Sequence, residues 1–304
     1  MEHHHHHHHS APTQSLNGIF ILSIILNVLF VLVEAGVGLW QNSLSLLSDA
    51  GHNLSDVFSL VLVLVAFRLA KVQRNERFTY GYRKSTVLIS LLNAVILLVA
   101  VGAIVIESIH KFSEPAQVNG IAVSWTAGVG ILINGATALL LMRGQKSDLN
   151  VRGAFLHMAA DTLVSVGVVI SGIVIHFTGW MIIDPVVSLI IAAVILFSTW
   201  ELLSDSLRLA VDGIPDGVDL NEIEQIVVAN EHVKEIHHIH VWAISTTETA
   251  LTAHVVLDDL SSWPKVSERI KHHLAEHGIS HATLEPETTE CQCVDRECGM
   301  EGTK

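Results

Sequence analysis

Long apolar runs alternate with short polar segments through the first two thirds of the chain. A helix needs on the order of 20 mainly apolar residues to cross the hydrocarbon core of a bilayer. Runs of that length occupy residues 17–40, 44–69, 86–109, 118–142, 152–177 and 182–205. The pattern therefore predicts six transmembrane helices. The first run is too long for a signal peptide and lacks a small-residue cleavage pattern.

The pattern changes after the sixth run, where residues 212–217 form a hinge rich in glycine and proline. Asp219 is a suitable N-cap for a helix that reaches about residue 230. Residues 233–244 and 249–257 alternate like two strands joined by a turn. Pro264 suits the first turn of a second helix, which Gly278 ends, and residues 281–284 read as a short strand. This αββαβ order predicts helices packed on one face of a small sheet.

These elements predict a helical membrane protein with a small α+β domain. We expect residues 11–207 to form the transmembrane domain, 208–290 the α+β domain and 291–304 a polar tail. Residues 1–10 include seven consecutive histidines, His3–His9, which are typical of a purification tag and are left out of every metal argument.

Composition and charge agree with a membrane protein. Half of the residues are hydrophobic and only 15% are charged, against roughly a quarter in an ordinary soluble domain. The net charge is −2 up to Leu207 and −11 from Arg208 onward, which together give the −13 of the chain. An acidic domain has the wrong sign for gripping phosphates, so nucleic acid is excluded as a partner.

The placement of lysine and arginine orients the spans. Nine of them lie in the connections after the second and fourth spans, and the opposite-side connections hold only Lys111. Basic residues favour cytoplasmic connections. We therefore expect an integral protein of a bacterial inner membrane, surrounded by lipid, with both termini and the acidic domain in the cytoplasm. All three cysteines lie in the last fourteen residues, so no disulfide framework holds the fold together.

Two spans carry the same pair of ionisable residues at the same spacing. His52 precedes Asp56 in the second span, and His157 precedes Asp161 in the fifth. Residues i and i+4 share a helix face, so two such helices face to face supply two nitrogens and two oxygens. That donor set suits Zn²⁺ and does not exclude Co²⁺, Fe²⁺ or Mn²⁺.

The alternative is that each pair is a structural hydrogen bond between helices, as polar residues often are in membranes. A structural bond needs one donor and one acceptor, whereas the two pairs bury four polar groups. Their burial costs several kcal/mol unless a cation or protons neutralise the charge. The repeated pair therefore favours a metal site.

Five segments give the chain a resemblance to a known family. They are Ser43–Asp56, Phe78–Tyr82, Leu149–Ala154, Asp184–Pro185 and the hinge running into Val233–His237. In these segments the chain resembles the cation diffusion facilitator family.

The resemblance implies a homodimeric metal/proton antiporter with six spans and a cytoplasmic metallochaperone-like domain. It makes His52, Asp56, His157 and Asp161 the transport site, of the two-histidine, two-aspartate kind associated with zinc as the substrate. It also implies a regulatory zinc site at the dimer interface of the cytoplasmic domain, with the ligands His237, His254, Glu285 and Glu287.

Three further predictions concern residues outside these two sites. By the same resemblance, Lys84 and Asp212 form a charge pair between the loop after the second span and the hinge. The tail cysteines resemble those of relatives that collect additional zinc, and an inert tail is the alternative; these cysteines are Cys291, Cys293 and Cys298. Two intramembrane acids, Glu34 and Asp49, are candidate proton or metal relays.

The first predicted strand is rich in histidine. Side chains alternate between the two faces of a strand, so His238 and His240 are expected on one face and His237 on the other. An isolated strand histidine is more often a surface or packing residue than a ligand.

Two other functions remain as rivals. A metal sensor would bind zinc in the cytoplasmic domain without moving it across the membrane. An enzyme is suggested by the segment His273–His277, which matches the His-x-x-Glu-His pattern of inverted zinc peptidases. We expect this match to be accidental and the protein not to be an enzyme, because a short motif arises easily in a histidine-rich domain.

Overall fold

The computed structural model describes residues 13–40, 44–113, 120–180 and 182–289. The chain forms two compact units, which are described separately. The first holds the described residues up to Leu69 together with Leu92–Leu203. The second holds Ala70–Leu91 together with the described residues from Ser204 onward.

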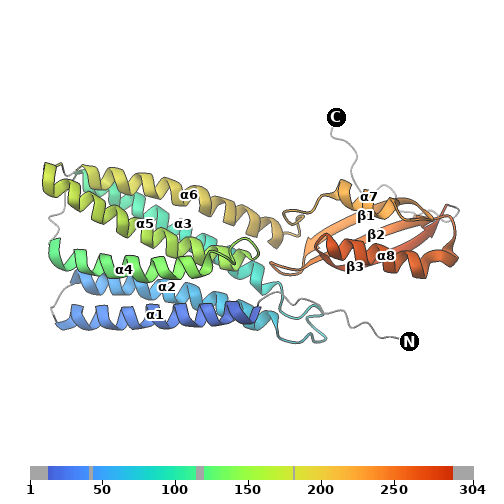
Figure 1. Cartoon of the computed structure of the whole chain (residues 1–304), viewed down its shortest axis with the longest axis horizontal. Coiled ribbons are helices and arrows are strands. Elements are labelled where there is room, and N and C mark those ends of the chain that lie inside the picture. Colours follow the sequence, from blue (N-terminus) through green and yellow to red (C-terminus); the bar gives the residue numbers. More distant parts are fainter. Residues whose placement is uncertain (1–12, 41–43, 114–119, 181, 290–304) are drawn as a thin grey trace. The chain divides into compact units, whose positions relative to one another are not determined.

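Six long helices make up the membrane part, as the apolar runs predict (Figure 1). They are α1 (Thr13–Trp40), α2 (Leu44–Ala70), α3 (Ser85–Ser113), α4 (Gly120–Leu141), α5 (Leu149–Thr178) and α6 (Ile183–Ala210). Within the described residues, α1, α3, α5 and α6 are long and apolar enough to cross a membrane, and α4 contains a shorter apolar run at Gly128–Leu141.

The interior of the first unit is apolar, and so is its outer surface. Side chains of α1, α2, α4 and α5 meet in a buried cluster that includes Phe20, Leu60, Leu141 and Met158. Many large apolar side chains of the long helices are exposed, among them Leu32, Val99, Leu132, Ile173 and Phe197. A soluble protein would bury such surface, whereas lipid solvates it.

The cytoplasmic part has the predicted αββαβ order, with one short 3-10 helix added at Leu260–Ser262. Its elements are α7 (Leu220–Val228), β1 (Val233–Ala243), β2 (Thr249–Leu257), α8 (Trp263–Glu276) and β3 (Ile279–Thr288). The side chain of Asp219 accepts a hydrogen bond from the Asn221 amide, so the predicted N-cap of α7 is confirmed.

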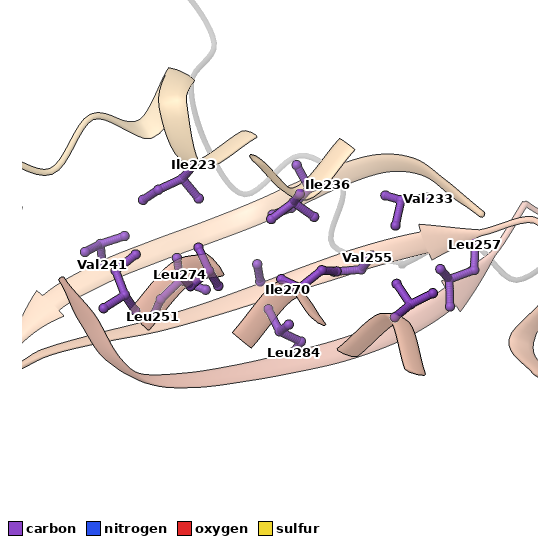
Figure 2. Packing of buried hydrophobic residues seen from close by; sticks show 14 residues of the cluster. Ile223, Val233, Ile236, Val241, Leu251, Val255, Leu257, Ile270, Leu274 and Leu284 are labelled. Atoms are coloured by element: carbon purple, nitrogen blue, oxygen red, sulfur yellow. The ribbon is translucent and has the colours of Figure 1, made fainter. Parts of the chain in front are cut away.

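The three strands lie in the order β1-β2-β3, with β1 antiparallel and β3 parallel to the central strand β2. Helices α7 and α8 bury their apolar residues against the sheet, as Figure 2 shows for Ile223, Ile270 and Leu274. The facing strand residues of this core include Leu251 and Val255. Burial of these side chains removes apolar surface from water and provides the main stabilisation of the domain.

Two local predictions about the strands are wrong. Strand β3 spans Ile279–Thr288 rather than residues 281–284, because it pairs with β2 along the whole length of that strand. Strand β1 does not alternate regularly. Its pairing skips from His237, opposite His254, to His240, opposite Thr252. Of the two residues between them, His238 has φ +53°. This bulge breaks the period of two, so His238 does not lie on the opposite face from His237.

Candidate metal centres

The membrane helices bring three of the four predicted transport ligands together. Asp56 of α2 is fully buried, and its Oδ1 lies 2.7 Å from Nε2 of His157 in α5. The same Nε2 lies 3.9 Å from Oδ2 of Asp161, one turn further along α5. One ligand atom from each residue lies within 4.8 Å of the other two. Such spacing fits a single divalent ion held between the atoms.

The fourth predicted ligand, His52, belongs to the same continuous helix as Asp56, one turn earlier. Its side chain lies outside the described residues, as does that of Asp49. Helix geometry places positions i and i+4 on one face, which is why α2 offers two ligand positions to α5.

A buried polar contact joins α1 to the segment of α2 that carries Asp56. Glu34 of α1 is 2% exposed, and its Oε2 accepts a hydrogen bond of 2.8 Å from the side-chain amide of Asn53. Asn53 lies between the two α2 ligand positions in sequence. The contact ties α1 to the turn of α2 that carries the ligands. Sequence reasoning proposed Glu34 as a relay and missed Asn53 as its partner.

The cytoplasmic sheet contains a second cluster. His237 of β1 pairs in register with His254 of β2, and His254 pairs with Glu285 of β3. Glu287 follows two residues later on the same face of β3. The register of three strands thus places all four predicted regulatory ligands side by side.

Three of these four ligands form a compact set. Nδ1 of His254 contacts Oε1 of Glu287 at 2.5 Å, and Nε2 of His237 lies 3.3 Å from the other carboxylate oxygen. The three ligand atoms lie within 4.8 Å of one another. Glu285 lies further out: its side chain is 70% exposed and is 3.7 Å from Nε2 of His254. Two imidazoles and a carboxylate fit Zn²⁺.

The bulge adds a ring that alternation alone excludes. The His238 ring centroid lies 5.2 Å from that of His254 and 5.8 Å from that of His240. His237 also contacts His254, at 5.4 Å between centroids. Alternation alone placed His238 on the wrong face, because a bulge shifts the period of two and leaves no mark in the hydrophobic pattern of the strand.

The predicted loop-to-hinge pair, Lys84 and Asp212, is in contact. Nζ of Lys84 donates to Oδ1 of Asp212 at 2.6 Å, and also to the carbonyl oxygens of Leu209 at 2.7 Å and Ala243 at 3.0 Å. Three acceptors satisfy all three protons of the ammonium group. Asp212 itself has φ +61°, so this residue turns the chain out of α6.

Two further predictions concern the cysteine tail and the peptidase-like segment. The tail residues Cys291, Cys293 and Cys298 lie outside the described residues. In the peptidase-like segment, Nδ1 of His277 bonds the carbonyl of His273, and its Nε2 contacts Glu222 of α7 at 3.3 Å. The His277 ring thus contacts the end of α8 and the start of α7. The described contacts of this segment do not converge on one point, as the ligands of a metal ion would.

Comparisons with known proteins agree with this architecture. Residues 20–209 match the cation efflux transmembrane domain, and residues 215–288 match the cytoplasmic domain of cation efflux proteins. The chain is 35% identical to the "Cadmium, cobalt and zinc/H(+)-K(+) antiporter" of Bacillus subtilis over 275 residues, which cover 89% of this chain and 88% of the relative.

Two further relatives are similar to the same extent. The "Metal cation efflux system protein CzcD" of Cupriavidus metallidurans is 35% identical over 88% of this chain and 85% of its own. The "Zinc transporter ZitB" of Escherichia coli is 35% identical over 88% of this chain and 86% of its own. Family models and relatives alike cover both units, and the relatives are named as transporters and antiporters rather than enzymes. The chain therefore belongs to the cation diffusion facilitator family of metal efflux transporters.

Proposed function

We propose that this protein exports Zn²⁺ from the cytoplasm in exchange for protons, through a site formed by His52, Asp56, His157 and Asp161. The observation that carries the proposal is the buried cluster of Asp56, His157 and Asp161 between α2 and α5. Two carboxylates enclosed with one imidazole repel each other unless a cation or protons neutralise them. An ion pathway is the usual reason for such groups inside a membrane.

Coupling to protons follows from the chemistry of the ligands. Zinc binds neutral imidazole and ionised carboxylate, so zinc and protons compete for the same atoms. A site open to the cytoplasm loads zinc, and protonation of the histidine ligands after the helices open to the other side releases it. Return of the protons down their gradient resets the site.

Zinc is the substrate that we favour, because two nitrogens and two oxygens suit its tetrahedral geometry. The name of the Bacillus subtilis relative includes cadmium and cobalt beside zinc. Affinity order alone does not decide selectivity in cells, so Cd²⁺ and Co²⁺ are the competitors that an assay must include.

The cytoplasmic domain supports a second proposal, a homodimer with a regulatory zinc ligand. His237, His254 and Glu287 fit the ion, and Glu285 completes the set from the strand edge. We place this domain and both termini in the cytoplasm, because basic residues concentrate in the connections on that side.

The test is zinc flux into proteoliposomes under an imposed pH gradient. Asp161→Asn keeps the shape of the side chain and removes its charge, so flux is expected to fall to the level of empty vesicles. Glu107→Gln is the matched control, because Glu107 is an exposed acid of α3 whose contact is Lys111. This control is expected to transport like the unmodified chain.

Three results would contradict the proposal. Equal flux in Asp161→Asn and the unmodified chain would show that the cluster is not the transport site. Zinc binding with no flux in any variant would favour a sensor. Flux that ignores the pH gradient would exclude proton exchange. Selective flux of Cd²⁺ or Co²⁺ over Zn²⁺ would keep the site and change its substrate.

A further inference from the structure

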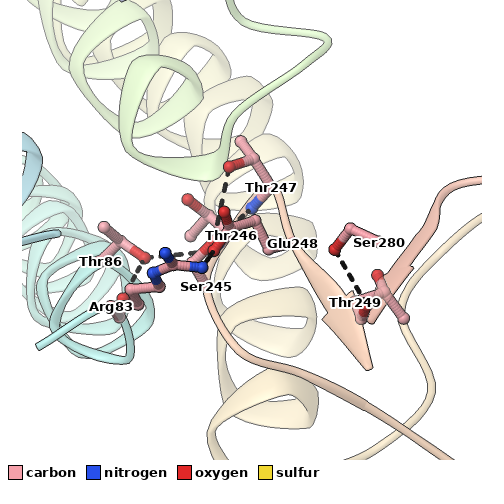
Figure 3. Close-up of polar contacts among 8 residues, drawn as sticks. All are labelled: Arg83, Thr86, Ser245, Thr246, Thr247, Glu248, Thr249 and Ser280. Carbon is pink, nitrogen blue, oxygen red and sulfur yellow. Dashed lines mark hydrogen bonds and ion pairs between the residues drawn. The ribbon is translucent and has the colours of Figure 1, made fainter. Parts of the chain in front are cut away.

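The turn between β1 and β2 is held by the start of α3. Nη1 of Arg83 donates to Oε2 of Glu248 at 2.8 Å, and the backbone amide of Thr246 donates to Oγ1 of Thr86 at 3.0 Å (Figure 3). Lys84, between them in sequence, donates to the carbonyl of Ala243 at the end of β1. Both ends of the turn and its middle therefore contact one short segment of chain.

The receiving hydroxyl is fixed in place. Thr86 is 3% exposed, and its Oγ1 donates a hydrogen bond of 2.9 Å to the carbonyl of Arg83, which leaves its lone pairs facing the Thr246 amide. A buried hydrogen bond of this kind is costly to lose, because the Thr246 amide would lose the acceptor that fixes it to α3.

The turn itself is stiff. The amides of Ile244 and Ser245 both donate to the carbonyl of Glu248, and the Thr247 amide donates to the Ser245 hydroxyl at 3.2 Å. Thr249, at the start of β2, is 8% exposed, and its carbonyl accepts from Ser280 of β3. The turn is thus part of the sheet and moves with it.

The same two strands carry the cytoplasmic metal ligands. His254 lies five positions after Thr249 on β2, and His237 lies six positions before Ala243 on β1. At about 3.3 Å per residue, the ligands lie on the order of 20 Å from the turn along paired strands. A change in the strands at the ligands therefore reaches the turn through the β1–β2 pairing, which is interrupted at the bulge of His238 and resumes from His240 to Ala243.

We propose that Arg83 and Thr86 are positioning residues that latch the β1–β2 turn to α3, so that zinc bound between the strands sets the transport rate through α3. The latch consists of Arg83, Thr86, Thr246 and Glu248. It rests on the proposed function and adds a route by which the cytoplasmic site acts. It differs from the Lys84–Asp212 pair, which joins the loop to the hinge rather than to the sheet.

The first test reverses the charges in the full chain and measures zinc flux in proteoliposomes. Arg83→Glu and Glu248→Arg are each expected to lower the maximal rate about fivefold without moving the half-saturating zinc concentration, because the transport ligands are untouched. The double reversal restores the rate. Arg74→Glu is the control, since Arg74 is an exposed arginine of the same loop with no ion pair in the described part of the chain.

A second test asks whether the latch carries the metal signal. Arg83→Glu is expected to have no further effect in a His254→Ala background, because both changes interrupt one route and coupled residues are not additive. Independent, multiplying effects would overturn the inference. So would a double reversal that fails to restore flux, or an Arg83→Glu variant that behaves like Arg74→Glu.

The contact also has a readout that does not depend on transport. Thr86→Val removes the acceptor of the Thr246 amide, and loss of one hydrogen bond corresponds to about fivefold faster amide exchange in the turn. Exchange across residues 250–257 stays unchanged if the sheet is intact. Unmodified protein without zinc flux would overturn the transport proposal, whereas normal flux with unchanged exchange in Thr86→Val would overturn the latch alone.

Discussion

Zinc bound to the cytoplasmic cluster is expected to stabilise the sheet, and His254 is the residue on which this depends. His254 lies on the central strand and contacts Glu287 through Nδ1 and Glu285 through Nε2. It is therefore the one described ligand that touches acids at two positions of β3. His254→Ala leaves His237, Glu287 and the largely exposed Glu285, fewer than the four ligands that a structural zinc site uses.

The expected size follows from mass action. Free zinc at about 100 times its dissociation constant stabilises the folded sheet by about 2.7 kcal/mol, because it binds the folded form only. In amide exchange that corresponds to roughly 100-fold slower opening of β1 and β2. The His254 side chain is 24% exposed and lies outside the apolar core, so its removal alone changes stability little.

The assay is hydrogen exchange of the whole protein in detergent, with zinc and with a chelator. His272→Ala is the matched control, because His272 is a 73% exposed histidine of α8 that contacts only Glu276 among the described ion pairs. Zinc protection is expected in the unmodified chain and the control and is expected to vanish in His254→Ala. Protection that survives His254→Ala would refute the assignment of this cluster as the zinc site.

Three further changes test the fold. Ile270→Ala truncates a side chain with no exposed surface and is expected to cost about 2–5 kcal/mol in denaturant unfolding of the domain; a loss below about 1 kcal/mol would contradict the packing. Gly81→Ala is expected to lower the melting temperature more than Gly179→Ala. Both residues have φ +69°, but only at Gly81 would the new Cβ lie 2.8 Å from a backbone oxygen. The hydrogen bond to His232 holds the pKa of Asp258 below 3.8, so its stabilisation is present above that pH and is lost as pH falls through the lowered pKa. Asp258→Asn should therefore flatten the fall in melting temperature between about pH 5 and pH 3.

The helical part could be predicted from sequence to within about five residues at each helix end. The predicted run at 44–69 corresponds to α2, Leu44–Ala70, and that at 152–177 corresponds to α5, Leu149–Thr178. Lipid imposes this regularity, because every backbone group of a span must be satisfied inside its own helix. The ligand pairs on α2 and α5 were found for the same reason, since each pair lies on one element with a fixed period.

The irregular parts of the sheet could not be predicted in this way. Strand β3 continues through Pro286 to Thr288, because a proline is tolerated on an edge strand, where its missing amide faces away from the ladder. The bulge at His238 left no sign in the hydrophobic pattern. It is visible only in the register between β1 and β2, which is a property of the pairing and not of any single segment.

The two proposed metal sites differ in what a sequence reveals about them. In the membrane, Asp56 and His157 meet because two helices face each other. In each helix the i, i+4 spacing of the histidine and the aspartate indicates which face carries them. In the sheet, His237, His254 and Glu287 come from three strands, and only the register brings them together. The latch is even harder to predict from sequence. Arg83 and Glu248 are 165 positions apart, and both lie in connections without periodicity. Residues that couple two sites therefore carry the weakest sequence signal, and charge reversal in pairs is the direct way to find them.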